Sequence, residues 1–319
     1  MRLSRKYFFV IGLALLAASC VTAPEPPLRV ATNVWPGYES LYLARSLGLY
    51  DNSPIRLVEM NSASEVSHAL RHGAVEAAAV TLDEALTLMQ DGVGLRVVLV
   101  MDVSNGADVV LARPGIASLK GLKGKRVGVE DGAVGAVMLD AALHAAELSG
   151  KDIHLVPLTV DEHLAAWRNN KVDALVTFEP VRTELMQQGA VDVFNSSQIP
   201  GRIVDVLVVR ASLIEQHRSA LKKLISGHFL ALNTLATHPQ EAATRMAPRL
   251  GIEPALVLKQ FSLLKLPDLK QNLVWLGGAT PTISGAARTL SDLMLQDKLL
   301  HQSVAVSELA EPTLLPEAN

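Results

Sequence analysis

SASEVSHALRHGAVEAAAVTLDEALTLMQDG, residues 62–92, returns 97 positions later as TVDEHLAAWRNNKVDALVTFEPVRTELMQQG, residues 159–189. The ungapped shift pairs Glu65 with Glu162 and brings the Leu-Met-Gln run near the end of each copy into register. Each copy opens with Ser/Thr-x-x-Glu, a capping box that satisfies backbone donors at the start of a helix. A capped helix, an apolar strand and a second helix are therefore expected in each copy.

The repeated unit is larger than this segment. The same shift places Val30 on Val127, so that strand, loop and helix are written three times near 29–92 and again near 126–189. Two copies of this length do not make a solenoid. The alternation predicts an α/β fold of two similar lobes, each a mostly parallel sheet flanked by helices. The alternative is that any two βαβ runs look alike without a duplication.

The N-terminal end reads as a targeting segment. Residues 1–19 have a basic start, an apolar run over 7–18 and small residues before Cys20, the only cysteine of the chain, which predicts a lipoprotein signal peptide. Cys20 would then be acylated, with palmitate among the expected chains, and would hold the protein at a membrane surface. Plain secretion with an incidental cysteine is the alternative.

The composition after the predicted signal peptide indicates a linker, limits the kinds of partner and allows a packed core. The proline-containing stretch 20–28 is expected to be an extended linker. Removing the three leader cations (Arg2, Arg5 and Lys6) takes the formal charge from −3 to −6. An acidic mature chain argues against nucleic acid as a partner. The remaining length, with 49% hydrophobic residues, is enough for a packed core without disulfides.

The domain boundaries follow from the order of the expected strands. Lobe 1 is expected to comprise 29–102 and 204–310, lobe 2 107–200, with crossovers near 102–106 and 201–205 and a loose tail over 311–319.

Ligands of open α/β sheets bind outside the carboxyl ends of the strands. Six loops lie at these ends, and the expected ligand-binding residues in them are Trp35, Tyr38, Glu39, Ser62, Ser64, Thr81, Asp83, Asp131, Gly132, Phe178 and Glu179. Asp205, near a further strand end, is also expected to bind the ligand. Trp35 would offer a flat face, although it could instead pack under its own helix. Glu179 would be an acceptor, or a simple helix-start charge.

Acid dominates these loops, with Glu84 in the loop of Asp83 and Glu130 beside Asp131, while Lys and Arg are almost absent. A site for a strong anion would be expected to contain Arg. A small ligand with an amino or cationic nitrogen, on a heterocycle or quaternary head, is therefore expected, held by stacking or cation–π contact.

Motifs for chemistry are missing. The sequence contains no Gly-x-Ser-x-Gly, no phosphate-binding Gly-x-x-x-x-Gly-Lys and no clustered Cys/His set. We expect no catalytic residue, no cofactor and no metal site. Glu65, His68 and His72 share one predicted helix face, which we interpret as a solvated surface.

The chain resembles the nitrate/sulfonate/taurine branch of periplasmic solute-binding proteins, which are related to thiamine-pyrimidine binders. The residues that carry the resemblance are Cys20, the run Asn33-Val-Trp-Pro-Gly-Tyr-Glu39, the run LKGLKGKRVGV over 119–129, Val172-Asp-Ala174 and Phe178-Glu-Pro180.

The resemblance implies a type II periplasmic-binding-protein fold with two hinge crossovers, which closes on its ligand. It also implies delivery to an ABC permease with its ATPase, at the periplasmic face of a bacterial membrane; we expect a monomer. The basic cleft residues expected for nitrate or a sulfonate are not evident. Alternatives are a membrane-tethered ligand sensor and, less favoured, an enzyme like the fungal thiamine-pyrimidine synthases, whose cysteine-rich motif this chain lacks.

Overall fold

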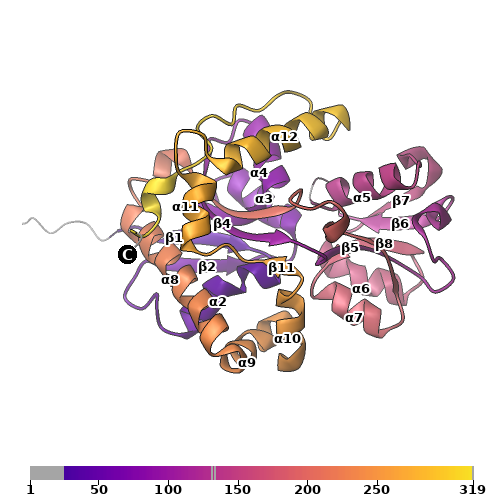
Figure 1. Cartoon of the computed structure of the whole chain (residues 1–319), viewed down its shortest axis with the longest axis horizontal. Coiled ribbons are helices and arrows are strands. Elements are labelled where there is room, and N and C mark those ends of the chain that lie inside the picture. Colours follow the sequence, from indigo (N-terminus) through magenta and orange to yellow (C-terminus); the bar gives the residue numbers. More distant parts are fainter. Residues whose placement is uncertain (1–24, 131, 133, 318–319) are drawn as a thin grey trace, which may run out of the picture.

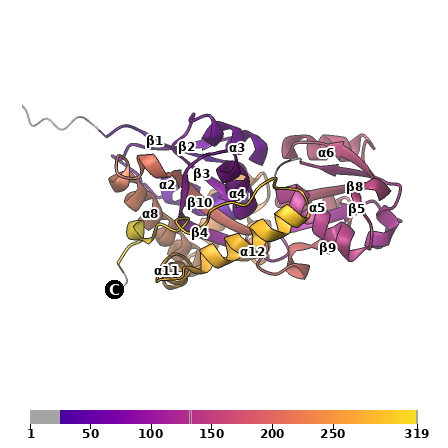
Figure 2. The ribbon, with the colours of Figure 1, turned by 90° about the horizontal axis from the view of Figure 1, so that it is seen from above.

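The computed structural model describes residues 25–130, 132 and 134–317, which form two α/β lobes side by side (Figures 1 and 2). The predicted signal peptide and Cys20 lie outside the described residues. Each lobe is built on one sheet, and two short connections join them. The predicted two-lobe fold is confirmed.

Lobe 1 contains a six-stranded sheet in the order β11-β4-β10-β3-β1-β2. Its strands are β1 (Leu28–Thr32), β2 (Ile55–Glu59), β3 (Ala77–Thr81), β4 (Leu95–Ser104), β10 (Val204–Arg210) and β11 (Leu264–Lys265). Its helices are α2 (Glu39–Ser46), α3 (Ala63–Arg71), α4 (Leu82–Gln90), α8 (Arg218–Thr237), α9 (Pro239–Leu250), α10 (Pro254–Phe261), α11 (Leu269–Leu276) and α12 (Thr282–Gln296).

Lobe 2 contains a five-stranded sheet in the order β7-β6-β8-β5-β9. Its strands are β5 (Asp108–Ala112), β6 (Arg126–Val129), β7 (His154–Pro157), β8 (Ala174–Phe178) and β9 (Val191–Asn195). Helix α5 (Val134–Ala145) covers one face, and α6 (Val160–Arg168) and α7 (Val181–Gln187) cover the other (Figure 1).

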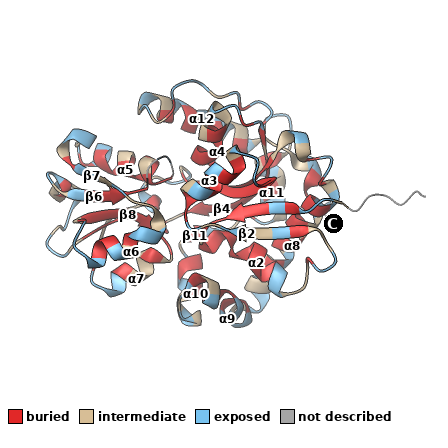
Figure 3. Ribbon diagram, turned by 180° about the vertical axis from the view of Figure 1, so that it is seen from behind, coloured by how far each residue is buried: buried red, intermediate tan, exposed pale blue. Residues whose placement is uncertain are grey.

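The duplication seen in the sequence is visible in the strand register. Val30 of β1 pairs with Ala77 of β3, and the residues 97 positions later, Val127 of β6 and Ala174 of β8, pair in the same way. Strands β3 and β8 are buried along their whole length because helices cover both faces of the sheets (Figure 3).

Both sheets are mixed. In lobe 1, β10 runs antiparallel to its neighbours β3 and β4. In lobe 2, β5 runs antiparallel to β8 and β9. Each of these strands enters its lobe directly from a crossover, so its first residues lie at the edge of the sheet that faces the other lobe.

The two crossovers run beside each other. The first follows β4 and the second precedes β10, and the Ser104 amide donates to the Ile203 carbonyl at 3.1 Å. The Ser196 hydroxyl accepts from the Gly106 amide at 2.6 Å and lies 2.8 Å from the Ser104 hydroxyl. Gly106 has φ +117°, a backbone conformation that residues with a side chain rarely adopt. These bonds form the hinge.

Two local expectations need correction. Ser62 caps α3 by accepting from the Glu65 amide, but the Glu65 carboxylate returns to the Asn61 amide and not to Ser62. The stretch predicted to be a loose tail packs on lobe 1 as far as it is described, since Leu314 and Leu315 are buried. No helix among the described residues is both long enough and apolar enough to cross a membrane.

Candidate ligand-binding cleft

The loops at the facing edges of the two sheets enclose a small cavity. Its lining residues are Asn33, Trp35, Tyr38, Ala63, Thr81, Glu84 and Asp205 from lobe 1 and Asp108, Val134 and Phe178 from lobe 2. The cavity volume is about 20 Å³, which is room for about one water molecule. This volume is too small for an organic ligand, so we interpret the structure as a closed form in which the lobes must separate to admit one.

Trp35 and Phe178 form the aromatic wall of the cavity, one from each lobe. Their rings meet edge to face, with centroids 5.7 Å apart and an interplanar angle of 84°. Trp35 follows β1, and Pro36 fixes the first turn of the short 3-10 helix Pro36–Tyr38 behind it. Both aromatic residues were predicted from the sequence to face the ligand.

Two further lobe–lobe contacts hold the closed form. The Ser64 amide at the start of α3 donates to Glu130 Oε1 at 2.8 Å. Gln260 Nε2 on α10 donates to Glu179 Oε2 at 2.9 Å. Glu130 and Glu179 both lie at the ends of lobe 2 strands, so the interface is made of the loops that surround the cavity.

Buried carboxyl groups dominate the chemistry of the cleft. Tyr38 donates from its hydroxyl to Asp205 Oδ1 at 2.6 Å, and Trp35 donates from Nε1 to Asp102 Oδ2 at 3.1 Å. Asp102 and Asp205 are paired in register on β4 and β10, and, after burial, the charge of Asp102 helps to raise the pKa of Asp205. An acidic pair therefore sits on the two strands that leave the hinge.

Several carboxylate oxygens in this region have no hydrogen-bond partner within the described part of the chain. They are Glu84 Oε1, Asp102 Oδ1, Asp108 Oδ2 and Asp205 Oδ2, and each of these residues is at most 3% exposed. The described residues that line the cavity include no Lys, Arg or His. Buried negative charge without a partner is costly, so the site requires protons or a cation.

Burial raises the pKa of these acids. The pKa of Glu84 rises to about 8, chiefly through burial and then through Asp83. The pKa values of Asp102 and Asp108 rise to about 7 for the same first reason, and that of Asp83 to about 6. For Asp205, burial and then the adjacent Asp102 raise the pKa well above its usual range.

Not every predicted contact reaches the cavity. Trp35, Tyr38, Thr81, Phe178 and Asp205 line it. Ser62 and Asp83 are buried but do not line it, and Gly132 is exposed. Asp131 lies outside the described residues.

Two predicted carboxylates have partners elsewhere. Glu39 is fully buried and forms an ion pair with Arg249, whose guanidinium also lies 3.5 Å from the centre of the Tyr42 ring. Burial nevertheless raises the pKa of Glu39 to about 7. Glu179 is bound by Arg182 and by the Thr183 amide in addition to Gln260.

Sequence reasoning missed Asp102 and Asp108 and did not single out Glu84. We interpreted residues 102–106 as a crossover, and only the position of Asp102 directly after the apolar run Val97–Met101 of β4 could have indicated a buried acid. The exposed Glu65 and His68 lie on α3 and the exposed His72 directly follows it, and none of the three lines the cavity.

Known proteins share sequence and fold with this chain. A "Putative binding protein" of Brucella abortus (strain 2308) is 22% identical over 272 residues, which are 79% of this chain and 81% of that protein. The alkanesulfonate-binding protein SsuA of Xanthomonas axonopodis pv. citri, solved with MOPS, superposes with a TM-score of 0.76 at 19% identity, covering 92% of this chain and all of that one.

The same fold also occurs in the desulfurization enzyme DSZB, with a TM-score of 0.64 at 19% identity over 91% of this chain and 97% of that one. At these identities the solved structures show the fold alone. A profile of the NMT1-like family matches residues 22–251. That range spans both sheets apart from β11, and the chain belongs to the NMT1-like family.

Proposed function

We propose that the protein captures a small organic ligand with a cationic nitrogen in the cleft between its lobes and delivers it to an ABC permease. The observation that carries this proposal is the cavity wall. Glu84, Asp108 and Asp205 line one small space, and each has a buried carboxylate oxygen without a hydrogen-bond partner among the described residues. N–H groups of an ammonium or amidinium ion would satisfy these acceptors with charge-assisted hydrogen bonds. The rings of Trp35 and Phe178 would cover its apolar part.

Closure is the second part of the proposed function. The Ser64–Glu130 and Gln260–Glu179 contacts join the lobes, and a ligand that compensates the buried carboxylates favours the state in which these contacts form. The permease would recognise the closed pair of lobes. In keeping with the leader pattern of the sequence, we place the protein as a monomer at the periplasmic face of a bacterial membrane, anchored through Cys20.

A sulfonate is the second candidate ligand, because the Xanthomonas relative is an alkanesulfonate-binding protein. The chemistry of the cleft opposes it, since no cation lines the described cavity. A sulfonate would need carboxyl groups that are protonated and donate hydrogen bonds. The two candidates therefore predict opposite effects of pH on affinity.

The direction in which pH changes the ligand affinity follows from the raised pKa values of the cleft acids. With pKa values of about 7 for Asp108 and about 8 for Glu84, ionisation becomes easier as pH rises from 6 to 8. A cation binds the ionised form, so its affinity should rise across this range, by up to about tenfold per pH unit for each proton released. A sulfonate binds the protonated form, and its affinity should fall.

The test is a thermal-shift screen of aminopyrimidines, quaternary amines, sulfonates and nitrate at pH 6 and pH 8. A ligand at a hundred times its dissociation constant adds about 2.7 kcal/mol of stability. The proposal predicts hits among amine-bearing compounds, with tighter binding at pH 8. Hits confined to sulfonates or nitrate would contradict the cationic ligand and leave the binding role intact.

Two other roles are distinguishable. A ligand sensor would use the same closure to signal to a membrane receptor, and a neighbouring kinase or cyclase gene in place of a permease gene would favour it. An enzyme would convert a bound ligand into product. We propose binding without turnover, because the only cysteine of the chain is Cys20, outside the cleft loops, and the described cavity lining offers no His, Ser or Cys nucleophile.

A further inference from the structure

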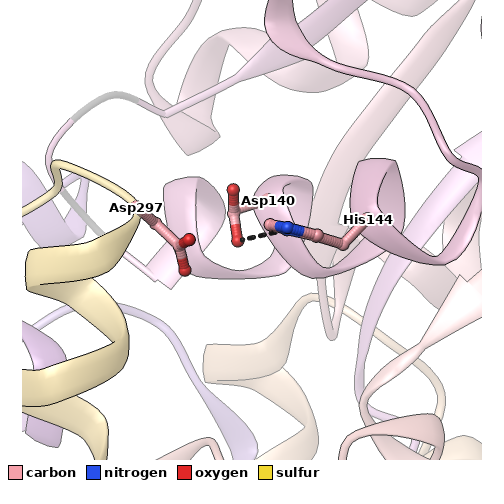
Figure 4. Close-up of side chains that lie close together, drawn as sticks. All are labelled: Asp140, His144 and Asp297. Atoms are coloured by element: carbon pink, nitrogen blue, oxygen red, sulfur yellow. Dashed lines mark hydrogen bonds and ion pairs between the residues drawn. The ribbon is translucent and has the colours of Figure 1, made fainter.

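Three side chains that are suited to bind a metal ion meet outside the cleft, where the two lobes approach each other (Figure 4). Asp140 and His144 lie on α5 of lobe 2, and Asp297 follows the last turn of α12 in lobe 1. One ligand atom from each of the three lies within 4.8 Å of the others. The group therefore joins segments that the hinge moves relative to each other.

The geometry within α5 suits a small divalent ion. Asp140 and His144 are four residues apart and share one face of the helix. His144 Nδ1 lies 3.3 Å from Asp140 Oδ2, which is long for an N–H···O hydrogen bond. Two ligands bound tetrahedrally at about 2.0–2.2 Å from a zinc ion are separated by roughly this distance.

The type of donor narrows the choice of metal. One imidazole nitrogen with two carboxylate oxygens fits zinc and the neighbouring divalent transition metals. Calcium and magnesium prefer shells made of oxygen alone. Three protein ligands leave a further position for water.

The charges of the group also require compensation. Asp140 and Asp297 place carboxylate oxygens within 4.8 Å of each other, and each carboxylate carries a negative charge when ionised. Lobe closure thus brings two acidic side chains together, and a cation between them would turn this repulsion into attraction.

We propose that Asp140, His144 and Asp297 form a site for a divalent transition metal, with Zn²⁺ as the fitting ion, that fastens lobe 2 to lobe 1 in the closed form. The open form offers only the two ligands on α5, so the metal binds the closed form more tightly and shifts the population toward it. By linkage, closure around a ligand tightens metal binding by the same factor. The inference does not depend on what the cleft binds.

The test uses Zn²⁺ alone and measures the distance between the lobes. Closure is measured by double electron–electron resonance between two spin labels in a Cys20→Ser background. The labels are attached at Lys151→Cys in lobe 2 and Gln240→Cys in lobe 1, which are both exposed positions. Zn²⁺ should move the distance distribution to shorter values in this background. Asp297→Asn and His144→Ala should each abolish the shift. Without metal, the Asp297→Asn variant should be at least as closed as the background protein, because the repulsion between the Asp140 and Asp297 carboxylates is removed.

A second possible zinc ligand pair supplies the control. His68 on α3 and His72 directly after it are exposed, with ring centroids 4.3 Å apart, and both belong to lobe 1. His72→Ala should lower the zinc stoichiometry in calorimetry at most, and it should leave the zinc-dependent closure intact.

Three results would overturn the proposal. They are the absence of any zinc-dependent shift, a shift of the same size in Asp297→Asn, and zinc binding at His144 without closure. The second would place the metal on α5 alone.

Discussion

Replacing Asp205 by Asn should stabilise the ligand-free protein, increasingly so as pH rises. Asp205 is 2% exposed, accepts from the Tyr38 hydroxyl and faces Asp102 across paired strands. Burial and then Asp102 raise its pKa well above the usual range, so folding favours the protonated form of the Asp205 carboxyl group. Asn reproduces that protonated group, with its oxygen toward Tyr38 and its amide toward Asp102.

The magnitude follows from the proton balance. An unfolded Asp ionises near pH 3.9, and one pKa unit corresponds to about 1.4 kcal/mol. A folded-state pKa that is raised means stability that is present at low pH and is lost as pH rises toward the folded value. Each pH unit above about 4 at which Asp205 stays protonated should therefore cost the wild type about 1.4 kcal/mol relative to Asp205→Asn.

Thermal and urea denaturation at pH 5, 6 and 7 would measure this effect. The gap between variant and wild type should widen from pH 5 to pH 7, by at most about 1.4 kcal/mol per pH unit. Asp51→Asn, on the exposed surface, controls for the loss of one carboxyl group. Parallel curves for Asp205→Asn and the wild type would refute the reasoning, because Asp205 would then be ionised in the folded state.

Three further substitutions test other parts of the site. Trp35→Phe should cost about 1–3 kcal/mol in urea denaturation, because Asp102 loses the indole N–H that it accepts; an unchanged midpoint would contradict this bond. Arg249→Met should cost about 3–5 kcal/mol by leaving the Glu39 charge buried without its partner, and adding Glu39→Gln should recover part of the loss. Gln260→Ala should increase the radius of gyration in small-angle scattering by weakening closure, whereas an unchanged radius would show that this bond does not hold the lobes.

The repeat carries most of the information that predicts the fold. A shift that keeps Val30 and Ala77 aligned with Val127 and Ala174 also keeps their pairing in space. Side chains next to a strand end could be placed for the same reason, since the carboxyl ends of parallel strands meet at one edge. Trp35 and Phe178 illustrate this, because each follows or ends such a strand and both line the cavity.

Contacts between distant segments could not be predicted in this way. Glu39 lies next to the cleft in sequence, yet its partner Arg249 is 210 positions away on α9. Asp102 meets Asp205 only because β10 returns from lobe 2 and pairs with β4. No local pattern indicates either contact, so the sequence predicted Asp205 as a ligand-binding residue but placed Asp102 only in a crossover.

The position of the acids in the hinge strands explains why, in the proposed function, the free energy of lobe closure depends on a ligand. Asp102 follows the apolar run Val97–Met101 of β4, Asp108 opens β5 and Asp205 lies near the start of β10, and all three are buried in this structure. Water solvates their charges in an open cleft, and closure without a ligand requires them to take up protons. A cationic ligand removes that requirement, and its binding free energy then favours the closed arrangement of the lobes. In the proposed function, the acids that make the empty closed form unfavourable near and above neutral pH are the same groups that make closure depend on the ligand.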